Sequence, residues 1–223
     1  MDEPTIVQRM PWSRGDVTVE PLLTREWLVT NGLGGYAAGT VGGVPTRRYH
    51  GSLNAALPAP HGRTMMLSYL SERVRLQDGT LVQIGGEERT TGELAVPTAA
   101  VLEEFRLEAG LPTWRYHAGD AVIEKRMVMP YRQNTMLVRY RLLAGPATAR
   151  VELQPALHFR GHDAMVDTPD PGAHVWTISG DRYEVSAGEH LPPLRLRMLG
   201  AQISFTHSPQ SLELQYRAEQ ARG

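Results

Sequence analysis

The sequence predicts an all-β protein in which two large antiparallel sheets stack face to face. Alternating or β-rich segments recur along nearly the whole chain of 223 residues, and turn residues separate them at spacings of roughly eight to twelve residues. Apolar residues at helical spacing are scarce, so we expect helices to be few and short. The number of expected strands favours two large sheets over a small sandwich.

Each expected strand is a short run that is rich in β-branched residues or alternates in polarity. The segment Arg63–Arg75 fits neither the strand period nor the helix period cleanly, so its type stays open. No low-complexity linker interrupts the pattern, and we therefore expect a single domain over residues 1–223. In chain order the expected strands are Val17–Glu20, Glu26–Thr30, Ser52–Leu57, Leu81–Ile84, Val101–Leu107, Thr113–His117, Ala121–Val128, Asn134–Leu142, Arg150–His158, His174–Ser179, Arg182–Ala187, Leu194–Leu199, Gln202–Thr206 and Leu212–Tyr216.

The composition excludes several classes of function. The formal net charge is −1 and Lys125 is the single lysine, which leaves no basic surface for nucleic acid or for a membrane. Cysteine is absent, which removes disulfides, thiolate metal sites and cysteine nucleophiles. The first residues show no secretory signal, and no apolar run reaches bilayer length. We therefore expect a soluble, cytoplasmic chain with no nucleic-acid and no membrane partner.

The most informative segment runs from Glu26 to Leu57. It contains seven glycines and, at Thr46–Gly51, the hexapeptide Thr-Arg-Arg-Tyr-His-Gly. Glycine at this density permits tight turns and close backbone approach. We expect the glycines after Asn31 to fold the strand at Glu26–Thr30 back on itself, and a second reversal to follow before Pro45. This path would place the hexapeptide beside Asn31.

The same region resembles the opening motif of the amylo-α-1,6-glucosidase family, the glycogen debranching enzymes of bacterial and archaeal type. A weaker likeness extends over residues 155–165 and 212–223, whereas residues 85–150 share only the β pattern. The matching elements, in order, are Glu26–Leu28, Thr30–Gly35, Gly39–Thr40, Thr46–Gly51 and Gly62–Thr64.

The resemblance implies a fold and a role. Members of the family begin with a β-supersandwich, similar to galactose mutarotase and to the N-terminal domain of glucoamylase. An α/α-toroid barrel follows and holds the acid and base carboxylates. The resemblance thus implies that the barrel lies C-terminal to residue 223, that this chain contains no catalytic residue, and that the chain alone is inactive. It favours an excised domain over a natural short protein.

The parent enzyme so implied hydrolyses α-1,6 branch points of glycogen or limit dextrin and needs no cofactor. The partners of this chain would be the barrel of the same polypeptide and an α-glucan, meaning glycogen, limit dextrin or maltooligosaccharide.

Two polar segments are candidates for binding substrate or for holding the domain interface. Planar donors bridge neighbouring sugar hydroxyls, and aromatic rings pack on the apolar face of a sugar. The same groups could instead hold glycine-rich turns or a second domain through ion pairs, and the sequence leaves both alternatives open. The candidate residues are Asn31, Arg47, Arg48, Tyr49, His50, Arg160, His162 and Asp163.

Two other patterns predict neither a metal site nor catalysis. His158 and His162 share a face only on a helix, and the preceding run is a predicted strand, so we expect a polar loop and no metal. The doublets Glu87-Glu88 and Glu103-Glu104 do not supply a glycosidase acid and base, because adjacent strand residues point to opposite faces. We expect solvated or interface charges at these positions.

Other functions stay open from the sequence alone. They are a stand-alone carbohydrate-binding module, a structural docking domain without a ligand, and a self-sufficient epimerase of mutarotase type. The epimerase needs a histidine and a carboxylate that converge in the concave face of a sheet, and the candidate histidines are His50, His117, His158 and His174. The tryptophans are expected to anchor the core or an interface, and they are Trp12, Trp27, Trp114 and Trp176.

Overall fold

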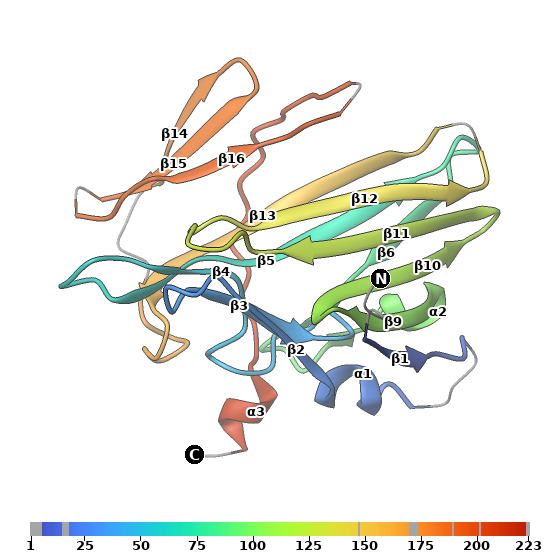
Figure 1. Cartoon of the computed structure of the whole chain (residues 1–223), viewed down its shortest axis with the longest axis horizontal. Coiled ribbons are helices and arrows are strands. Elements are labelled where there is room, and N and C mark those ends of the chain that lie inside the picture. The colour runs from blue at the N-terminus through green and yellow to red at the C-terminus, as the bar shows by residue number, and fades with distance from the viewer. Residues whose placement is uncertain are drawn as a thin grey trace, which may run out of the picture.

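The computed structural model describes residues 6–14, 18–146, 148–169, 174–188, 190–200 and 202–221. Strands make up 50% of the structure and helices 6%, which confirms the all-β class. Figure 1 shows two large antiparallel sheets packed together, with a smaller three-stranded sheet standing apart at the upper left.

One large sheet has five strands in the order β1-β9-β10-β11-β12, and all neighbouring strands are antiparallel. Ala109 and Gly110, which join β9 to β10, both have positive φ, as a two-residue hairpin turn of type I′ requires. The strands are β1 (Val7–Pro11), β9 (Leu102–Glu108), β10 (Leu111–Ala118), β11 (Ala121–Val128) and β12 (Leu137–Ala144).

The other large sheet has six strands in the order β13-β5-β4-β3-β2, with β6 paired to β5. The segment whose type the sequence left open is β5, a strand of 13 residues that pairs with β13 along most of its length. The strands are β2 (Glu26–Thr30), β3 (Tyr36–Thr40), β4 (Gly51–Ala56), β5 (Arg63–Arg75), β6 (Leu81–Ile84) and β13 (Arg150–Gly161).

The described residues also contain two small sheets and three short helices. None of these helices has the length and apolarity needed to cross a bilayer. The small sheets consist of β14 (His174–Ser179), β15 (Arg182–Ala187) and β16 (Leu194–Arg197), and of β7 (Glu87–Glu88) and β8 (Leu94–Ala95). The helices are α1 (Glu20–Thr24), α2 (Thr98–Val101) and α3 (Arg217–Gln220).

Three expected strands are wrong. Residues 202–206 have no regular structure, and residues 212–216 contribute only an isolated bridge from Leu214 to Arg89. Of the expected strand Val17–Glu20, Val17 lies outside the described residues and Glu20 begins α1. Pro21 stands in the first turn of that helix, where its missing N–H has no intrahelical partner to lose.

The two large sheets meet across an apolar core. Trp114 on β10 packs edge to face against Trp27 on β2, with ring centroids 5.5 Å apart. Its Nε1 donates a hydrogen bond to the backbone carbonyl of Val41, and Phe105 on β9 adds a ring contact at 5.1 Å. Buried aromatic anchors from both sheets therefore fix how the sheets stack, as expected for these two tryptophans.

A charged cluster also joins the two sheets within this core. Glu72 on β5 is 1% exposed and accepts a 2.8 Å hydrogen bond from Nζ of Lys125 on β11. Tyr140 on β12 donates to the same carboxylate, and the ammonium lies 5.0 Å from the ring centroid of Trp114. The single lysine of the chain is thus an internal cross-link between the sheets.

Candidate functional site at the glycine-rich end of the sandwich

The glycine-rich segment forms the β2–β3 hairpin, as expected. Gly32 and Gly34 have φ of 76° and 95°, in the left-handed region that favours glycine. Asn31 is fully buried, and its Oδ1 accepts hydrogen bonds from the backbone N–H groups of Leu33 (2.9 Å) and Gly35 (3.0 Å). The second expected reversal is also present, since β4 pairs antiparallel with β3.

The amide nitrogen of Asn31 holds a second segment in place. Nδ2 donates to the backbone carbonyl of Gln133 (3.0 Å) and to Oδ1 of Asn134 (2.9 Å). Asn134 in turn bonds both the N–H and the carbonyl of Ala56 on β4. Every hydrogen-bonding group of the Asn31 side chain is therefore used inside the protein, which indicates a structural role.

The hexapeptide Thr46–Gly51 is a turn rather than an extended segment. The backbone N–H of His50 donates to the carbonyl of Arg47 (3.0 Å), and the N–H of Thr46 donates to Nδ1 of His50 (3.0 Å). Burial lowers the pKa of His50 to about 4, although the neighbouring carboxylate of Glu26 acts in the opposite direction. His50 is therefore neutral at pH 7, and Nδ1 is free to accept.

Arg47 and His50 both contact the first residue of β2. Nε of Arg47 donates to the carboxylate of Glu26, and Nε2 of His50 lies 3.4 Å from it. Asn31 lies just beyond the opposite end of that strand, five residues along and thus about 16–17 Å away at roughly 3.3 Å per residue. The expected contact between Asn31 and the hexapeptide is therefore wrong, because the second reversal returns the chain to the start of β2 and not to its end.

Arg48 ties the hexapeptide to α3. Its backbone N–H and its Nε donate to the carboxylate of Glu219 at 3.1 and 2.8 Å. The N–H of Ala218 donates to the carbonyl of Thr46 at 3.0 Å. The Glu219 side chain is only 9% exposed, so this ion pair is well shielded. These contacts favour the structural alternative for the hexapeptide.

The second candidate segment lies against the hexapeptide. Arg160 on β13 is 4% exposed, and its Nη2 donates to the backbone carbonyl of Arg48 (2.7 Å) while Nη1 donates to three carbonyls that follow. The ring of His162 lies 5.9 Å from the ring of Tyr49, and burial lowers the pKa of His162. The Asp163 side chain is 76% exposed. The structure therefore brings seven of the eight candidate residues to one region, Asn31 excepted.

His158, His162 and Asp163 do not converge. Nε2 of His158 lies 2.9 Å from the backbone carbonyl of Thr168, whereas Nδ1 of His162 lies 3.9 Å from Asp163. In the part of the chain that the structure describes, no three His, Asp or Glu side chains are grouped so that they could hold a metal ion.

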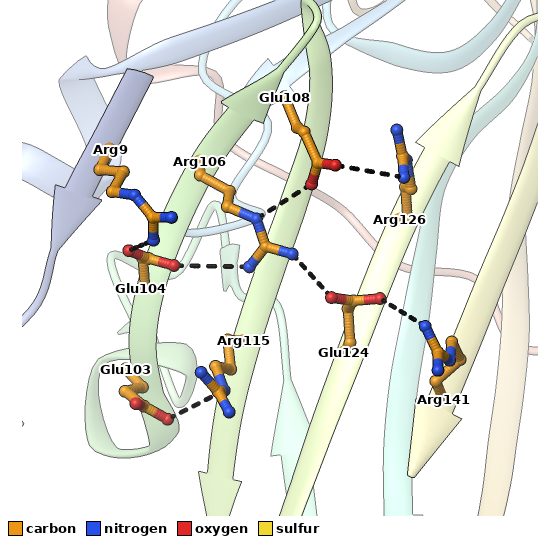
Figure 2. Close-up of polar contacts among 9 residues, drawn as sticks. All are labelled: Arg9, Glu103, Glu104, Arg106, Glu108, Arg115, Glu124, Arg126 and Arg141. Atoms are coloured by element: carbon orange, nitrogen blue, oxygen red, sulfur yellow. Dashed lines mark hydrogen bonds and ion pairs between the residues drawn. The ribbon is translucent and has the colours of Figure 1, made fainter. Parts of the chain in front are cut away.

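The outer face of the five-stranded sheet carries a network of ion pairs (Figure 2). At its centre, Arg106 on β9 lies 2.7 Å from Glu124, 3.3 Å from Glu108 and 3.4 Å from Glu104. These carboxylates thus neutralise a guanidinium that is only 15% exposed.

The expectation that Glu103 and Glu104 point to opposite faces is wrong. Arg115 on β10 opposes Glu104, but the next residue of β10 opposes Leu102, so Glu103 is the extra residue of a β-bulge. Figure 2 shows both carboxylates among arginine side chains. Glu103 is 45% exposed, as expected of a solvated charge, whereas Glu104 is only 16% exposed and is paired with arginines.

The other doublet is paired as well. Glu87 accepts hydrogen bonds from Nε and Nη2 of Arg89. Glu88 accepts from Nε and Nη2 of Arg217 on α3, at 2.7 and 3.0 Å. All four doublet carboxylates are therefore paired with arginines. Arg217 also lies 3.8 Å from Glu20, so α3 forms three ion pairs with the rest of the described chain.

The fold is a large β-sandwich, and α3 is held against it by ion pairs and by a backbone hydrogen bond to the hexapeptide. A family model described as "Glycogen debranching enzyme N terminal" matches residues 25–223. The chain therefore belongs to this family of N-terminal domains of glycogen debranching enzymes, which confirms the resemblance. Comparison with curated proteins and comparison with solved structures each gave no match.

Two residues beside the β2–β3 hairpin were not among the candidates from the sequence. Tyr131, between β11 and β12, is 77% exposed, and it falls within residues 85–150, where the sequence motifs alone showed no likeness to the family beyond a β pattern. Arg63, the first residue of β5, stands within the matching element Gly62–Thr64 but had no assigned role. The polar run that follows Pro130 could have marked the first of them as a loop residue.

Proposed function

We propose that this chain is the non-catalytic N-terminal domain of an amylo-α-1,6-glucosidase, which hydrolyses the branch points of glycogen and limit dextrin. Its role is to position an α/α-barrel that follows in the same polypeptide and carries the acid and base. Membership of the family supports the first part of the proposal.

The observation that carries the second part is the joint between the hexapeptide and α3. Arg48 binds Glu219 through two hydrogen bonds, and Thr46 accepts one from Ala218. A polypeptide that continues from α3 would leave the sandwich at this joint (Figure 1). These contacts support a role for the family motif in orienting a polypeptide that follows the helix.

Two variants in the polypeptide that includes the barrel test this role. Arg48→Ala and Glu219→Gln each remove a shielded ion pair, so we expect a loss of about 1–3 kcal/mol in the free energy of unfolding. The double variant should be no worse than the worse single variant, because both remove the same interaction. The KM for limit dextrin should stay near that of the wild type.

A matched control is Arg197→Ala, which removes an exposed ion pair with Asp181 on the three-stranded sheet. Thermal melts should show little change for this variant. If Arg48→Ala instead raises the KM and leaves the melting temperature unchanged, the hexapeptide contacts glucan and the proposed joint is wrong.

A second role, glucan binding by this domain itself, is favoured by the exposed ring of Tyr131. Native electrophoresis of the chain in gels that contain glycogen tests it, because bound glucan retards migration.

A further inference from the structure

Tyr131 presents an aromatic ring to solvent at the glycine-rich end. It is 77% exposed, the most exposed aromatic side chain among the described residues. Its ring lies directly on Gly32, where a Cβ atom would come within 2.6 Å of the ring. Gly32 therefore supports the ring in a way that no other residue at that position would.

Backbone hydrogen bonds hold the loop that carries this ring. The N–H of Arg132 donates to the carbonyl of Asn31 at 2.7 Å, and the N–H of Gln133 donates to the carbonyl of Pro130 at 3.2 Å. Arg132 has φ of 59°, in the left-handed region that is unfavourable for a residue other than glycine. The buried amide of Asn31 also holds Gln133. These hydrogen bonds thus hold a loop that keeps the Tyr131 ring exposed to water.

An arginine flanks the same hairpin. The guanidinium of Arg63 lies 3.5 Å from the position that a Cβ of Gly34 would occupy. Gly32 and Gly34 are two residues apart, so their Cα atoms are at most about 7 Å from each other. Among the residues that the structure describes, no carboxylate forms an ion pair with Arg63, unlike the arginines of Figure 2.

His162, whose side chain is 19% exposed, connects Arg63 to two tyrosine rings. The N–H of His162 donates to the carbonyl of Arg63 at 3.0 Å, and the ring of His162 lies 6.1 Å from Tyr36 and 5.9 Å from Tyr49. Tyr49 is 40% exposed. The strip that runs from Tyr131 past Arg63 to Tyr49 is hereafter the aromatic strip.

We propose that the aromatic strip binds an α-glucan chain, with the Tyr131 ring stacked on one glucose unit and Arg63 donating to hydroxyls of a neighbouring unit. A rigid ring suits the apolar face of a sugar, and a planar guanidinium bridges vicinal hydroxyls. The absence of a carboxylate partner for Arg63 in the described residues suits a neutral ligand that accepts hydrogen bonds. This inference rests on the proposed function, since it takes its ligand class from it.

Retardation of the 223-residue chain in native gels with increasing glycogen measures binding directly. We expect the wild type to be retarded, Tyr131→Ala to lose most of the retardation, and Tyr131→Trp to keep it, because the larger ring still stacks. Arg63→Gln should weaken retardation to an intermediate degree. Leu199→Ala, at a residue that is 82% exposed, is the matched control and should migrate as the wild type does.

Two results would overturn the inference. One is a wild-type chain that migrates equally with and without glycogen, and the other is equal retardation of Tyr131→Ala and the wild type. Thermal melts of all variants guard against unfolding, and maltoheptaose as a competitor should abolish retardation. If Tyr131→Ala leaves retardation intact but lowers glucose release by the barrel-containing polypeptide, the strip contacts the barrel instead. The proposed function has a separate readout, glucose release itself.

Discussion

Removal of the single lysine tests the stacking of the two sheets. Lys125→Met deletes the ammonium that lies 2.8 Å from Glu72 and leaves that carboxylate 1% exposed, with Tyr140 as its remaining donor. Breaking a buried pair by removing one partner costs about 3–5 kcal/mol. In a domain of this size each kcal/mol lowers the Tm by about 2–4 °C, so we expect a decrease of roughly 6–20 °C.

A second variant separates lost charge from lost packing. In the double variant Glu72→Gln/Lys125→Met the buried site is neutral, and the amide oxygen still accepts from Tyr140. We therefore expect it to recover much of the loss. The exposed pair Arg75–Glu152 provides the control, because Arg75→Ala should change the Tm by no more than about 2 °C. Differential scanning calorimetry measures all four proteins. A Tm for Lys125→Met as close to the wild type as that of the control would show that the pair does not bridge the sheets.

Three further predictions concern other buried or networked polar groups. Burial lowers the pKa of His50 from 6.5 to about 4. Between these two pH values the unfolded chain binds a proton at this residue and the folded chain does not. The free energy of unfolding therefore falls by up to on the order of 3 kcal/mol as the pH drops from 6.5 to 4. His50→Asn keeps a hydrogen-bond acceptor and should reduce the fall in Tm between pH 6.5 and 4. An unchanged dependence of Tm on pH, or an equal reduction in the exposed control His190→Asn, would contradict the burial of His50. Arg106→Met leaves three carboxylates without their shared cation. We therefore expect urea titrations to show a decrease of about 1–3 kcal/mol in the free energy of unfolding, and a smaller decrease in 1 M NaCl. A decrease that is independent of salt would contradict the network. Asn31→Asp replaces the amide nitrogen by a carboxylate oxygen that faces two hydrogen-bond acceptors, the carbonyl of Gln133 and Oδ1 of Asn134. We expect urea titration to show a decrease of about 2–4 kcal/mol in the free energy of unfolding. An unchanged free energy of unfolding would show that the Asn31 amide does not hold the two segments together.

Much of the fold could be predicted because period and turn chemistry agree along most of the chain. The expected strands at Leu81–Ile84 and Ala121–Val128 have the bounds that the structure shows. By contrast, β3 (Tyr36–Thr40) was missed because Gly39 and two alanines lower its strand propensity. Its pairing with β2 and the contact between the rings of Tyr36 and His162 involve residues that a local pattern does not contain.

The site could be predicted only in part. Sequence singled out the two polar segments that the structure brings together, but it misplaced Asn31, because the position of Asn31 relative to the hexapeptide depends on where the second reversal sends the chain. The bulge at Glu103 interrupts the alternation of side-chain direction along β9, and no residue pattern in the sequence predicts it. The exposure of Tyr131 follows from its packing on Gly32, a contact between residues far apart in the chain.

Glucose release from limit dextrin tests the central claim most directly. We predict no sustained release by this chain alone, because its doublet glutamates are paired with arginines and the acid and base are expected in the barrel. A polypeptide that continues through the barrel should release glucose steadily. Sustained release by this chain alone, lost when a glutamate such as Glu72 is replaced by glutamine in a protein that still folds, would contradict the assignment as a non-catalytic domain.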